Sequence, residues 1–239
     1  MLELNKIYCC DVLDGLRSLP DKSIDLIITS PPYNKVGLQG NRKGQKWYKT
    51  IDYDDDPNND NMPEEEYQRW QVDILNECFR VLKDDGSMFY NHKNRINKGE
   101  IVTPYQWLFK TQFKVRQEII WDRGSGQNIN RCRYIPTTEL LFWLTKKERP
   151  RFDRGRDTLF KNEVWQINFE KGTEHPAPFP ITIPDNIIPC VAQGERITVL
   201  DPFMGSGTVA LSAVKNGCDY IGFEKFQKYI KMADERLCN

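Results

Sequence analysis

The sequence lacks long hydrophobic runs, an excess of either charge, and any signal-peptide pattern. No apolar stretch approaches the about 20 residues that a transmembrane helix needs, and the mean hydropathy is −0.65. This excludes a membrane-spanning protein. The first residues have neither a basic start nor an apolar stretch, so we expect a cytoplasmic protein without membrane contact. Basic and acidic residues number 34 each, so net charge alone gives no affinity for polyanions.

Histidine is scarce and the cysteines are scattered. His92 and His175 are the two histidines, and none of the seven cysteines belongs to a C-x-x-C pair. No zinc-ligand spacing is present, and we therefore predict a protein without a metal ion. An odd number of cysteines in a cytosolic chain indicates free thiols rather than disulfides.

Short apolar runs and amphipathic segments alternate along the chain. Strands are expected at residues 24–29, 87–90, 118–121, 140–144, 196–201 and 219–224. Helices are expected from Pro63 to a point just before Gly86, at 207–216 and at 225–237. This alternation predicts an α/β fold with a doubly wound, mostly parallel sheet. The connections are short, which predicts a single domain over residues 1–239.

Residues 35–62 and 146–174 do not fit this alternation and are predicted to be surface insertions. Both contain basic residues interleaved with aromatic ones. A basic stretch is usually solvated surface, but basic residues in such insertions also suit contact with phosphates. We expect nucleic-acid contacts from Lys43, Lys46, Arg151, Arg154 and Arg156.

The first motif is Asp-Pro-Phe-Met-Gly-Ser-Gly-Thr at residues 201–208, where a predicted strand meets a predicted helix. Glycines let a ligand approach the backbone, and a helix N-terminus offers N–H groups to an anion or a carboxylate. The next predicted strand ends at Glu224, where an acidic residue can bind both hydroxyls of a ribose. No G-x-x-x-x-G-K is present and G-x-G alone is weak evidence, so a plain strand–turn–helix is the alternative.

The second motif is Ser30-Pro31-Pro32-Tyr33, directly after the apolar run 24–29. Prolines lack an N–H group and fix the direction of the backbone carbonyls. A rigid carbonyl beside a serine hydroxyl forms a pair of acceptors for an exocyclic amino group. Tyr33 offers a flat face on which a base could stack. The alternative is a turn with one buried ring.

Together the two motifs resemble those of the DNA amino-methyltransferases that use S-adenosylmethionine, and the similarity spans nearly the whole chain. Ser-Pro-Pro-Tyr resembles the family's catalytic [DNS]-P-P-[YFW], and residues 201–208 resemble its methionine-binding D-P-F-x-G-S-G-T. The catalytic motif precedes the glycines, as in the beta group of these enzymes. The resemblance therefore implies a Rossmann-like methyltransferase fold in permuted motif order. The catalytic residues that it implies are Ser30, Pro31, Pro32 and Tyr33.

The resemblance also assigns a cofactor site. Residues 10–13, Cys-Asp-Val-Leu, resemble the family's G-D-x-L segment, whose aspartate accepts the adenine amino group of the cofactor. The segment that begins at His175 resembles H-P-x-x-x-P beside the cofactor. Cys10 replaces the usual glycine, and Phe179 replaces a common lysine. The implied S-adenosylmethionine-binding residues are Asp11, His175, Asp201, Phe203, Gly205, Ser206, Gly207, Thr208 and Glu224.

The implied activity is site-specific methylation of the exocyclic amine of a base flipped out of double-stranded DNA. Ser30 in the first motif position favours cytosine N4, with adenine N6 as the alternative. From other classes, the intact motifs disfavour a catalytically silent DNA-binding subunit. The permuted order and basic insertions disfavour an RNA or protein N-methyltransferase. The short insertions suit a short recognition site or a homodimer, and a cognate restriction endonuclease is a further candidate partner.

One dipeptide resembles a different chemistry. Pro189-Cys190 matches the nucleophile of enzymes that methylate ring carbon 5 of cytosine, but here it lies in the apolar run 187–191. We therefore interpret Cys190 as a core thiol.

Overall fold

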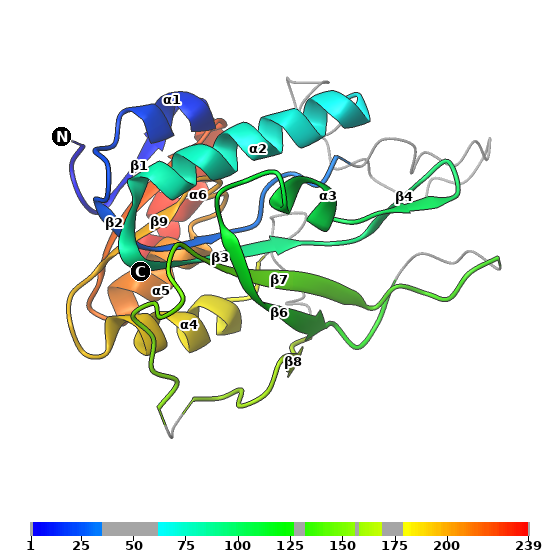
Figure 1. Cartoon of the computed structure of the whole chain (residues 1–239). Coiled ribbons are helices and arrows are strands. Elements are labelled where there is room, and N and C mark those ends of the chain that lie inside the picture. Colours follow the sequence, from blue (N-terminus) through cyan, green and yellow to red (C-terminus); the bar gives the residue numbers. More distant parts are fainter. Residues whose placement is uncertain (1, 35–61, 127–131, 156–157, 169–178, 239) are drawn as a thin grey trace.

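The computed structural model describes residues 2–34, 62–126, 132–155, 158–168 and 179–238, which form one large mixed sheet with helices on both faces (Figure 1). The strand order is β1-β10-β9-β2-β3-β7-β6-β8. In that order the strands are Lys6–Cys9, Asp219–Glu224, Thr198–Asp201, Ile24–Thr29, Leu82–His92, Thr138–Thr145, Lys114–Asp122 and Val164–Gln166. All of them except β7 run in the same direction. The predicted doubly wound, mostly parallel sheet is confirmed.

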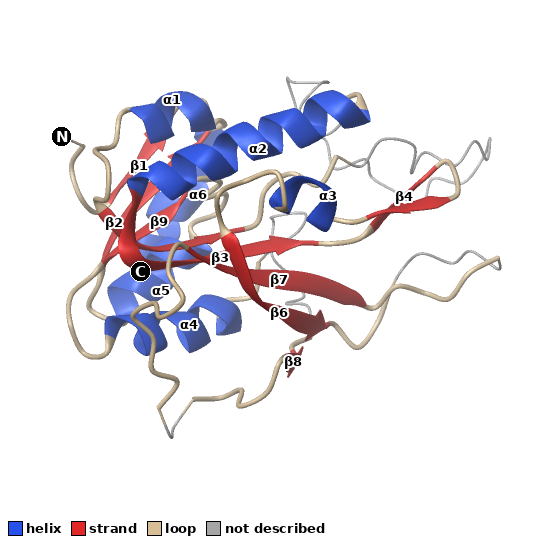
Figure 2. Cartoon of the chain, in the orientation of Figure 1, coloured by secondary structure: helices blue, strands red, loops and turns tan. Residues whose placement is uncertain are grey.

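Helices cover the two faces of the sheet in two groups (Figure 2). One face carries α1 (Val12–Arg17), α2 (Glu64–Val81) and α3 (Tyr105–Leu108), and the other carries α4 (Thr182–Ala192), α5 (Thr208–Lys215) and α6 (Gln227–Cys238). No helix among the described residues is long and apolar enough to cross a membrane.

The apolar run of β2 reflects its burial on both faces. Ile27 belongs to the buried cluster that contains Leu16 of α1 and Ile74 of α2. Its neighbour Ile28 belongs to the opposite cluster, which contains Ile187 of α4. Because successive strand residues point to opposite faces, a central parallel strand needs apolar residues in succession. The burial explains why this strand could be predicted with its observed bounds.

The prediction that the helix from Pro63 ends just before Gly86 is wrong. α2 ends at Val81, and Leu82 already has the extended backbone of β3. Gly86 therefore lies inside the strand, where a Cβ atom would come within 2.8 Å of the Asp25 carbonyl oxygen. Close approach of two strands, rather than a helix C-terminus, explains this glycine.

The first part of the predicted second insertion is packed against the core rather than standing away from it. After β7 the chain passes along the face that carries α4 and returns as β8, parallel to β6. Phe152 contacts Trp143 with ring centroids 4.3 Å apart, and Phe160 stacks on Trp165 at 5.1 Å. Apolar contact with the sheet therefore fixes much of this segment.

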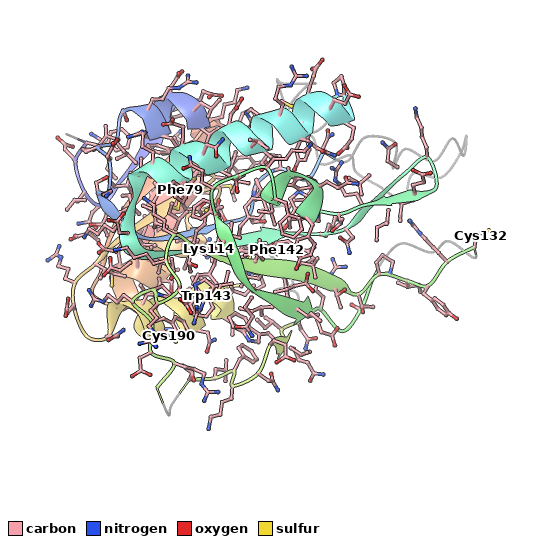
Figure 3. The ribbon with its side chains drawn as sticks, viewed as in Figure 1. Phe79, Lys114, Cys132, Phe142, Trp143 and Cys190 are labelled. Atoms are coloured by element: carbon pink, nitrogen blue, oxygen red, sulfur yellow. The ribbon has the colours of Figure 1, made fainter. Side chains whose placement is uncertain are left out.

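Two segments project beyond the sheet on the side where its parallel strands end. One is the hairpin of β4 (Arg95–Asn97) and β5 (Glu100–Val102). The other is the connection between β6 and β7, where Cys132 lies far from the core (Figure 3). We call this side of the sheet the carboxyl edge and the opposite side the amino edge.

Candidate active site

The polar residues of both motifs meet at the carboxyl edge. Hydrogen-bonded neighbours β10, β9 and β2 end at Glu224, Asp201 and Thr29, and Asp11 begins α1 shortly after β1. The chain connects β9 to β10 on one side and β2 to β3 on the other, so the order reverses between β9 and β2. Ligands of doubly wound sheets bind at such a switch point.

Asp201 and Thr29 form a direct bond across this switch point. The Thr29 hydroxyl donates to Oδ1 of Asp201 at 2.7 Å, and the Phe203 amide donates to the same oxygen at 3.0 Å. Asp201 is only 4% exposed. Burial raises the pKa of Asp201 to about 7, and the nearby Glu224 adds to the increase.

The glycine turn after β9 is fixed by Glu224 and by α6. Oε2 of Glu224 accepts from the Gly205 amide at 2.9 Å. Gly207 caps α5 with a φ of 82°, and a Cβ atom there would lie 2.7 Å from that of Ala233, so only glycine fits. Arg236 donates to the Ser206 carbonyl at 2.7 Å and to the Thr208 hydroxyl at 3.2 Å. Sequence reasoning did not identify Arg236, because a lone arginine in a terminal helix carries no motif.

These strand ends have the chemistry that S-adenosylmethionine requires. The Glu224 carboxylate accepts from the backbone N–H groups of Gly205 and Phe226 and has a further backbone hydrogen bond with Lys225. Its remaining lone pairs suit a ribose hydroxyl. Asp11 is exposed, and its Oδ1 caps α1 by accepting from the Leu13 amide at 2.9 Å; its other oxygen is suited to an adenine amino group. The N-terminus of α5 favours the amino-acid carboxylate. The residues present therefore fit the cofactor.

The tetrapeptide lies beside this cofactor half, at the end of β2. The oxygens of Ser30 and Tyr33 are 2.8 Å apart. The Tyr33 hydroxyl faces Oδ1 of Asn91 at 2.6 Å and Oε2 of Glu139 at 3.0 Å. The tyrosine is 8% exposed, and burial raises its pKa well above the usual value, with the charge of Glu139 adding to the shift. The ring contacts His92 at 4.7 Å between centroids.

The Pro32 carbonyl is turned into the protein by a buried hydrogen-bond chain. It accepts from the Tyr67 hydroxyl at 2.7 Å, which in turn accepts from Gln71 at 3.1 Å. Nε2 of His92 lies 2.7 Å from the same hydroxyl, and its Nδ1 lies beside the Lys93 backbone, 2.8 Å from the amide nitrogen and 2.9 Å from the carbonyl oxygen. Burial lowers the pKa of His92 to about 3, so the ring is neutral.

The two proline carbonyls therefore have different environments. Among the described residues, the Pro31 carbonyl accepts no hydrogen bond, whereas that of Pro32 is held by Tyr67. Ser30 is partly exposed. The acceptors left for an incoming amine are thus the Ser30 hydroxyl and the Pro31 carbonyl.

Several residues of the site lie outside both motifs. The sequence predicted the strands β3 and β7 as residues 87–90 and 140–144. Both predictions are too short at the carboxyl edge, so they leave out the polar residues that these two strands carry there. Polar residues at the end of a predicted strand were the available signal. The additional residues are Tyr67, Asn91, His92, Arg123 and Glu139.

Of the five predicted DNA-binding residues, the structure describes Arg151 and Arg154. Lys43, Lys46, Arg156 and the cofactor residue His175 lie outside the described residues. Arg151 lies at the amino edge, where its guanidinium binds the Ala192 carbonyl at 2.7 Å and Glu195 at 2.9 Å. Arg154 is exposed and binds the Lys161 carbonyl. The DNA contacts of Lys43, Lys46, Arg154 and Arg156 stay predictions, whereas the contacts of the Arg151 guanidinium favour an internal role for this residue over one at DNA.

The remaining cysteine and metal expectations concern the described residues. Cys190 is buried in α4, as Figure 3 shows, and is 3% exposed. Burial raises its pKa to about 11, which keeps the thiol protonated and confirms it as a core residue. The described part of the chain contains no group of three or more His, Cys, Asp or Glu side chains that could hold a metal ion.

The fold and its two motifs define an S-adenosylmethionine-dependent amino-methyltransferase. The chain belongs to the DNA methylase family of N6- and N4-specific enzymes, whose model matches residues 24–235. It is 29% identical to the type II methyltransferase M.BglII of Bacillus subtilis, covering 98% of this chain and 69% of that one.

Solved structures share the fold. The PvuII DNA methyltransferase, described as cytosine-N4-specific, superposes with a TM-score of 0.79 at 23% identity and covers 98% of this chain and 86% of its own. The complex of M1.HpyAVI with S-adenosylmethionine gives a TM-score of 0.63 at 21% identity, covering 97% and 98%. At these identities the likeness establishes the architecture, including the methyltransferase order of strands.

Proposed function

We propose that this DNA methyltransferase modifies the N4 amino group of cytosine within a specific site of double-stranded DNA. The observation that carries the proposal is the pair of acceptors formed by the Ser30 hydroxyl and the Pro31 carbonyl, one residue beyond the Thr29–Asp201 bond. The serine favours cytosine over adenine, and the structural likeness to a cytosine-N4-specific enzyme supports that choice.

The chemistry requires the protein to act mainly on the amine. S-adenosylmethionine supplies a methyl group that is already electrophilic because it is bound to a sulfonium. The lone pair of an exocyclic amine is delocalised into the base, so the nitrogen is a poor nucleophile. Acceptors at Ser30 and Pro31 bind its two hydrogens and favour the tetrahedral nitrogen. One such preorganised contact is typically worth about 2.7–4 kcal/mol, and positioning the reactants contributes up to about 7–11 kcal/mol.

We further propose that the base stacks on the Tyr33 ring after it leaves the duplex. Stacking contributes about 1–3 kcal/mol per base, which offsets the few kcal/mol that extrusion costs. The ammonium of Lys93 lies 5.3 Å from the ring centroid. A base on that face would take the place of this cation–π contact, and the flexible lysine side chain could then turn to a phosphate.

The DNA is expected to approach the carboxyl edge. The β4–β5 hairpin and the segment around Cys132 project from that edge (Figure 3), and Tyr134 in the second of these is 99% exposed. Lys98 is exposed at the hairpin turn. Contacts from these segments would supplement those predicted for residues 35–62 and 146–174. A homodimer and a cognate restriction endonuclease stay predictions as partners.

Product analysis tests the proposal. Duplex DNA of mixed sequence is incubated with the protein and labelled S-adenosylmethionine, with RNA and a protein mixture in parallel. The DNA is digested to nucleosides, and mass spectrometry identifies the product. We expect N4-methyldeoxycytidine alone. Detection of N6-methyldeoxyadenosine instead would overturn cytosine as the target base and assign adenine. Label in RNA or protein but not in DNA would contradict the proposal as a whole.

A further inference from the structure

We propose that Glu139, paired with Arg123, is a positioning residue that fixes the Tyr33 hydroxyl and thereby holds the Tyr33 ring beside Ser30 for the target base. The inference rests on the proposed role of the tetrapeptide in methyl transfer. Glu139 is the second residue of β7, and β3 lies between β7 and β2 in the sheet, so no sequence motif connects Glu139 to Ser30 or Tyr33.

Glu139 is buried, and both of its carboxyl oxygens have a partner. It is 6% exposed. Oε1 accepts from the Arg123 guanidinium at 3.1 Å, and Oε2 faces the Tyr33 hydroxyl at 3.0 Å. Arg123 is itself fixed by donation to the carbonyls of Pro136 and Thr137 at 3.0 and 3.2 Å. The carboxylate therefore has little freedom to turn away from the tyrosine.

The Tyr33 hydroxyl is held by two acceptors from neighbouring strands. Nδ2 of Asn91 donates to the Leu140 carbonyl at 3.0 Å, so Oδ1 of Asn91 faces the hydroxyls of Ser30 and Tyr33 as an acceptor. The Tyr33 oxygen lies 2.6 Å from Oδ1 of Asn91 and 3.0 Å from Oε2 of Glu139. Glu139 therefore adds a second fixed partner to this hydroxyl.

Ser30 contacts the same hydroxyl. Its oxygen lies 2.8 Å from that of Tyr33 and 3.2 Å from Oδ1 of Asn91. A displacement of the tyrosine hydroxyl would therefore also change the contacts that orient the Ser30 hydroxyl. By holding Tyr33, Glu139 keeps both side chains of the tetrapeptide in place.

Stability alone is a weak explanation for this ion pair. A buried salt bridge is often no more stabilising than well-packed apolar residues of similar volume. Here Glu139 is 6% exposed, and the pair lies beside the candidate catalytic residues. A role in orienting Tyr33 accounts for both the charge and its position.

A double-mutant cycle tests the inference. Single-turnover methyl transfer to duplex DNA and S-adenosylmethionine affinity are measured for wild type, Glu139→Gln, Tyr33→Phe and the double variant. We expect Glu139→Gln to slow transfer at least 10-fold with cofactor affinity within 2-fold of wild type. In the Tyr33→Phe background the same substitution should change the rate less than 2-fold, because the hydroxyl on which it acts is absent.

A matched control distinguishes this effect from the loss of any tyrosine–carboxylate contact. Glu118 accepts from the Tyr105 hydroxyl at 3.0 Å, away from the tetrapeptide. Glu118→Gln should leave the transfer rate within 2-fold of wild type. If Glu139→Gln does not fold by circular dichroism, Glu139→Asp, which keeps the charge but withdraws it from Tyr33, replaces it in the cycle with the same expected pattern.

The outcomes separate the inference from the proposed function. An inactive wild type would overturn the proposed function. Two results with an active wild type would overturn the positioning role alone. One is a normal transfer rate in Glu139→Gln, and the other is a double variant whose loss of rate equals the product of the two single losses.

Discussion

The Thr29 hydroxyl donates a 2.7 Å hydrogen bond to the buried carboxyl group of Asp201, and this bond joins the strand ends that carry the proposed catalytic and cofactor motifs. Thr29 ends the strand that leads into the tetrapeptide, and Asp201 ends the strand that leads into the glycine turn. In the sequence the two residues are 172 positions apart. The bond fixes the position of one motif relative to the other at the switch point of the sheet. In-line methyl transfer requires such a fixed arrangement.

The raised pKa of Asp201 predicts a pH-dependent stability. The folded pKa of about 7 exceeds the ordinary value of 3.8, so the folded chain binds the proton more tightly than the unfolded chain does. The stabilisation is complete below pH about 4 and is lost as the pH rises through about 7. Asp201→Asn keeps an oxygen that can accept from Thr29 and Phe203 but does not titrate. We expect its free energy of unfolding to decrease less between pH 4 and 8, by an amount on the order of a few kcal/mol.

Urea denaturation at several pH values measures this difference. Asp219→Asn is a suitable comparison, because Arg196 lowers the pKa of Asp219. Removing this carboxylate therefore changes the pH dependence of the free energy of unfolding in the opposite direction. Parallel curves for wild type and Asp201→Asn over this range would contradict the assignment of a buried, proton-binding carboxyl group.

Removing the carboxylate of Glu224 should weaken the cofactor without unfolding the protein. Its oxygens are expected to accept from the ribose hydroxyls, and hydrogen bonds to a charged group contribute about 1.5–3 kcal/mol. Glu224→Gln should therefore reduce S-adenosylmethionine affinity about 10- to 100-fold in calorimetric titration. Glu195→Gln, at the amino edge beside Arg151, should leave affinity unchanged. Equal affinity in both variants would remove Glu224 from the cofactor site.

Much of the fold was predictable because parallel strands buried on both faces have unmistakable sequences. The strands 24–29 and 219–224 were predicted with their observed bounds. The short edge strands β1 and β8 and the hairpin of β4 and β5 were not, since three or four residues without a full apolar pattern carry little signal. The antiparallel direction of β7 depends on tertiary pairing that no local pattern reports.

The site was predictable where its residues form contiguous motifs. Ser30 to Tyr33 and residues 201–208 met at one edge because the strands that carry them are neighbours. Glu139 and Arg123 were not found, because their contact with the tetrapeptide exists only in the folded sheet. The burial of the Tyr33 ring likewise follows from packing against His92, which no spacing in the sequence reveals.

Tyr33→Ala should separate catalysis from cofactor binding. The proposed partner of the ring is the flipped base. In the structure the ring contacts His92 and the hydroxyl contacts Ser30, Asn91 and Glu139, none of which is a proposed cofactor residue. We expect methyl transfer to duplex DNA to fall at least 100-fold while S-adenosylmethionine affinity stays near that of wild type. Thermal unfolding of the variant checks that the loss is not global. Normal turnover would count decisively against the stacking role.

The position of basic residues predicts which of them contact DNA. Lys93 and Lys98 lie at the carboxyl edge, whereas Arg151 is bound to Ala192 and Glu195 at the amino edge. Replacing both lysines with glutamine should lower DNA affinity and reduce the slope of log affinity against log salt by up to about 1.8, roughly 0.9 for each phosphate contact. Arg151→Gln should leave that slope unchanged. The opposite result would place the DNA against Arg151 at the amino edge.

Single-molecule sequencing of DNA from cells that express the protein tests the central claim most directly, because it reports the modified base and its sequence context together. Cells that express Tyr33→Ala provide the background. The account predicts N4-methylcytosine at one short recurring sequence in the wild-type sample and none in the variant. Methylated adenine at the recurring sequence, or no modified base above the background, would contradict it.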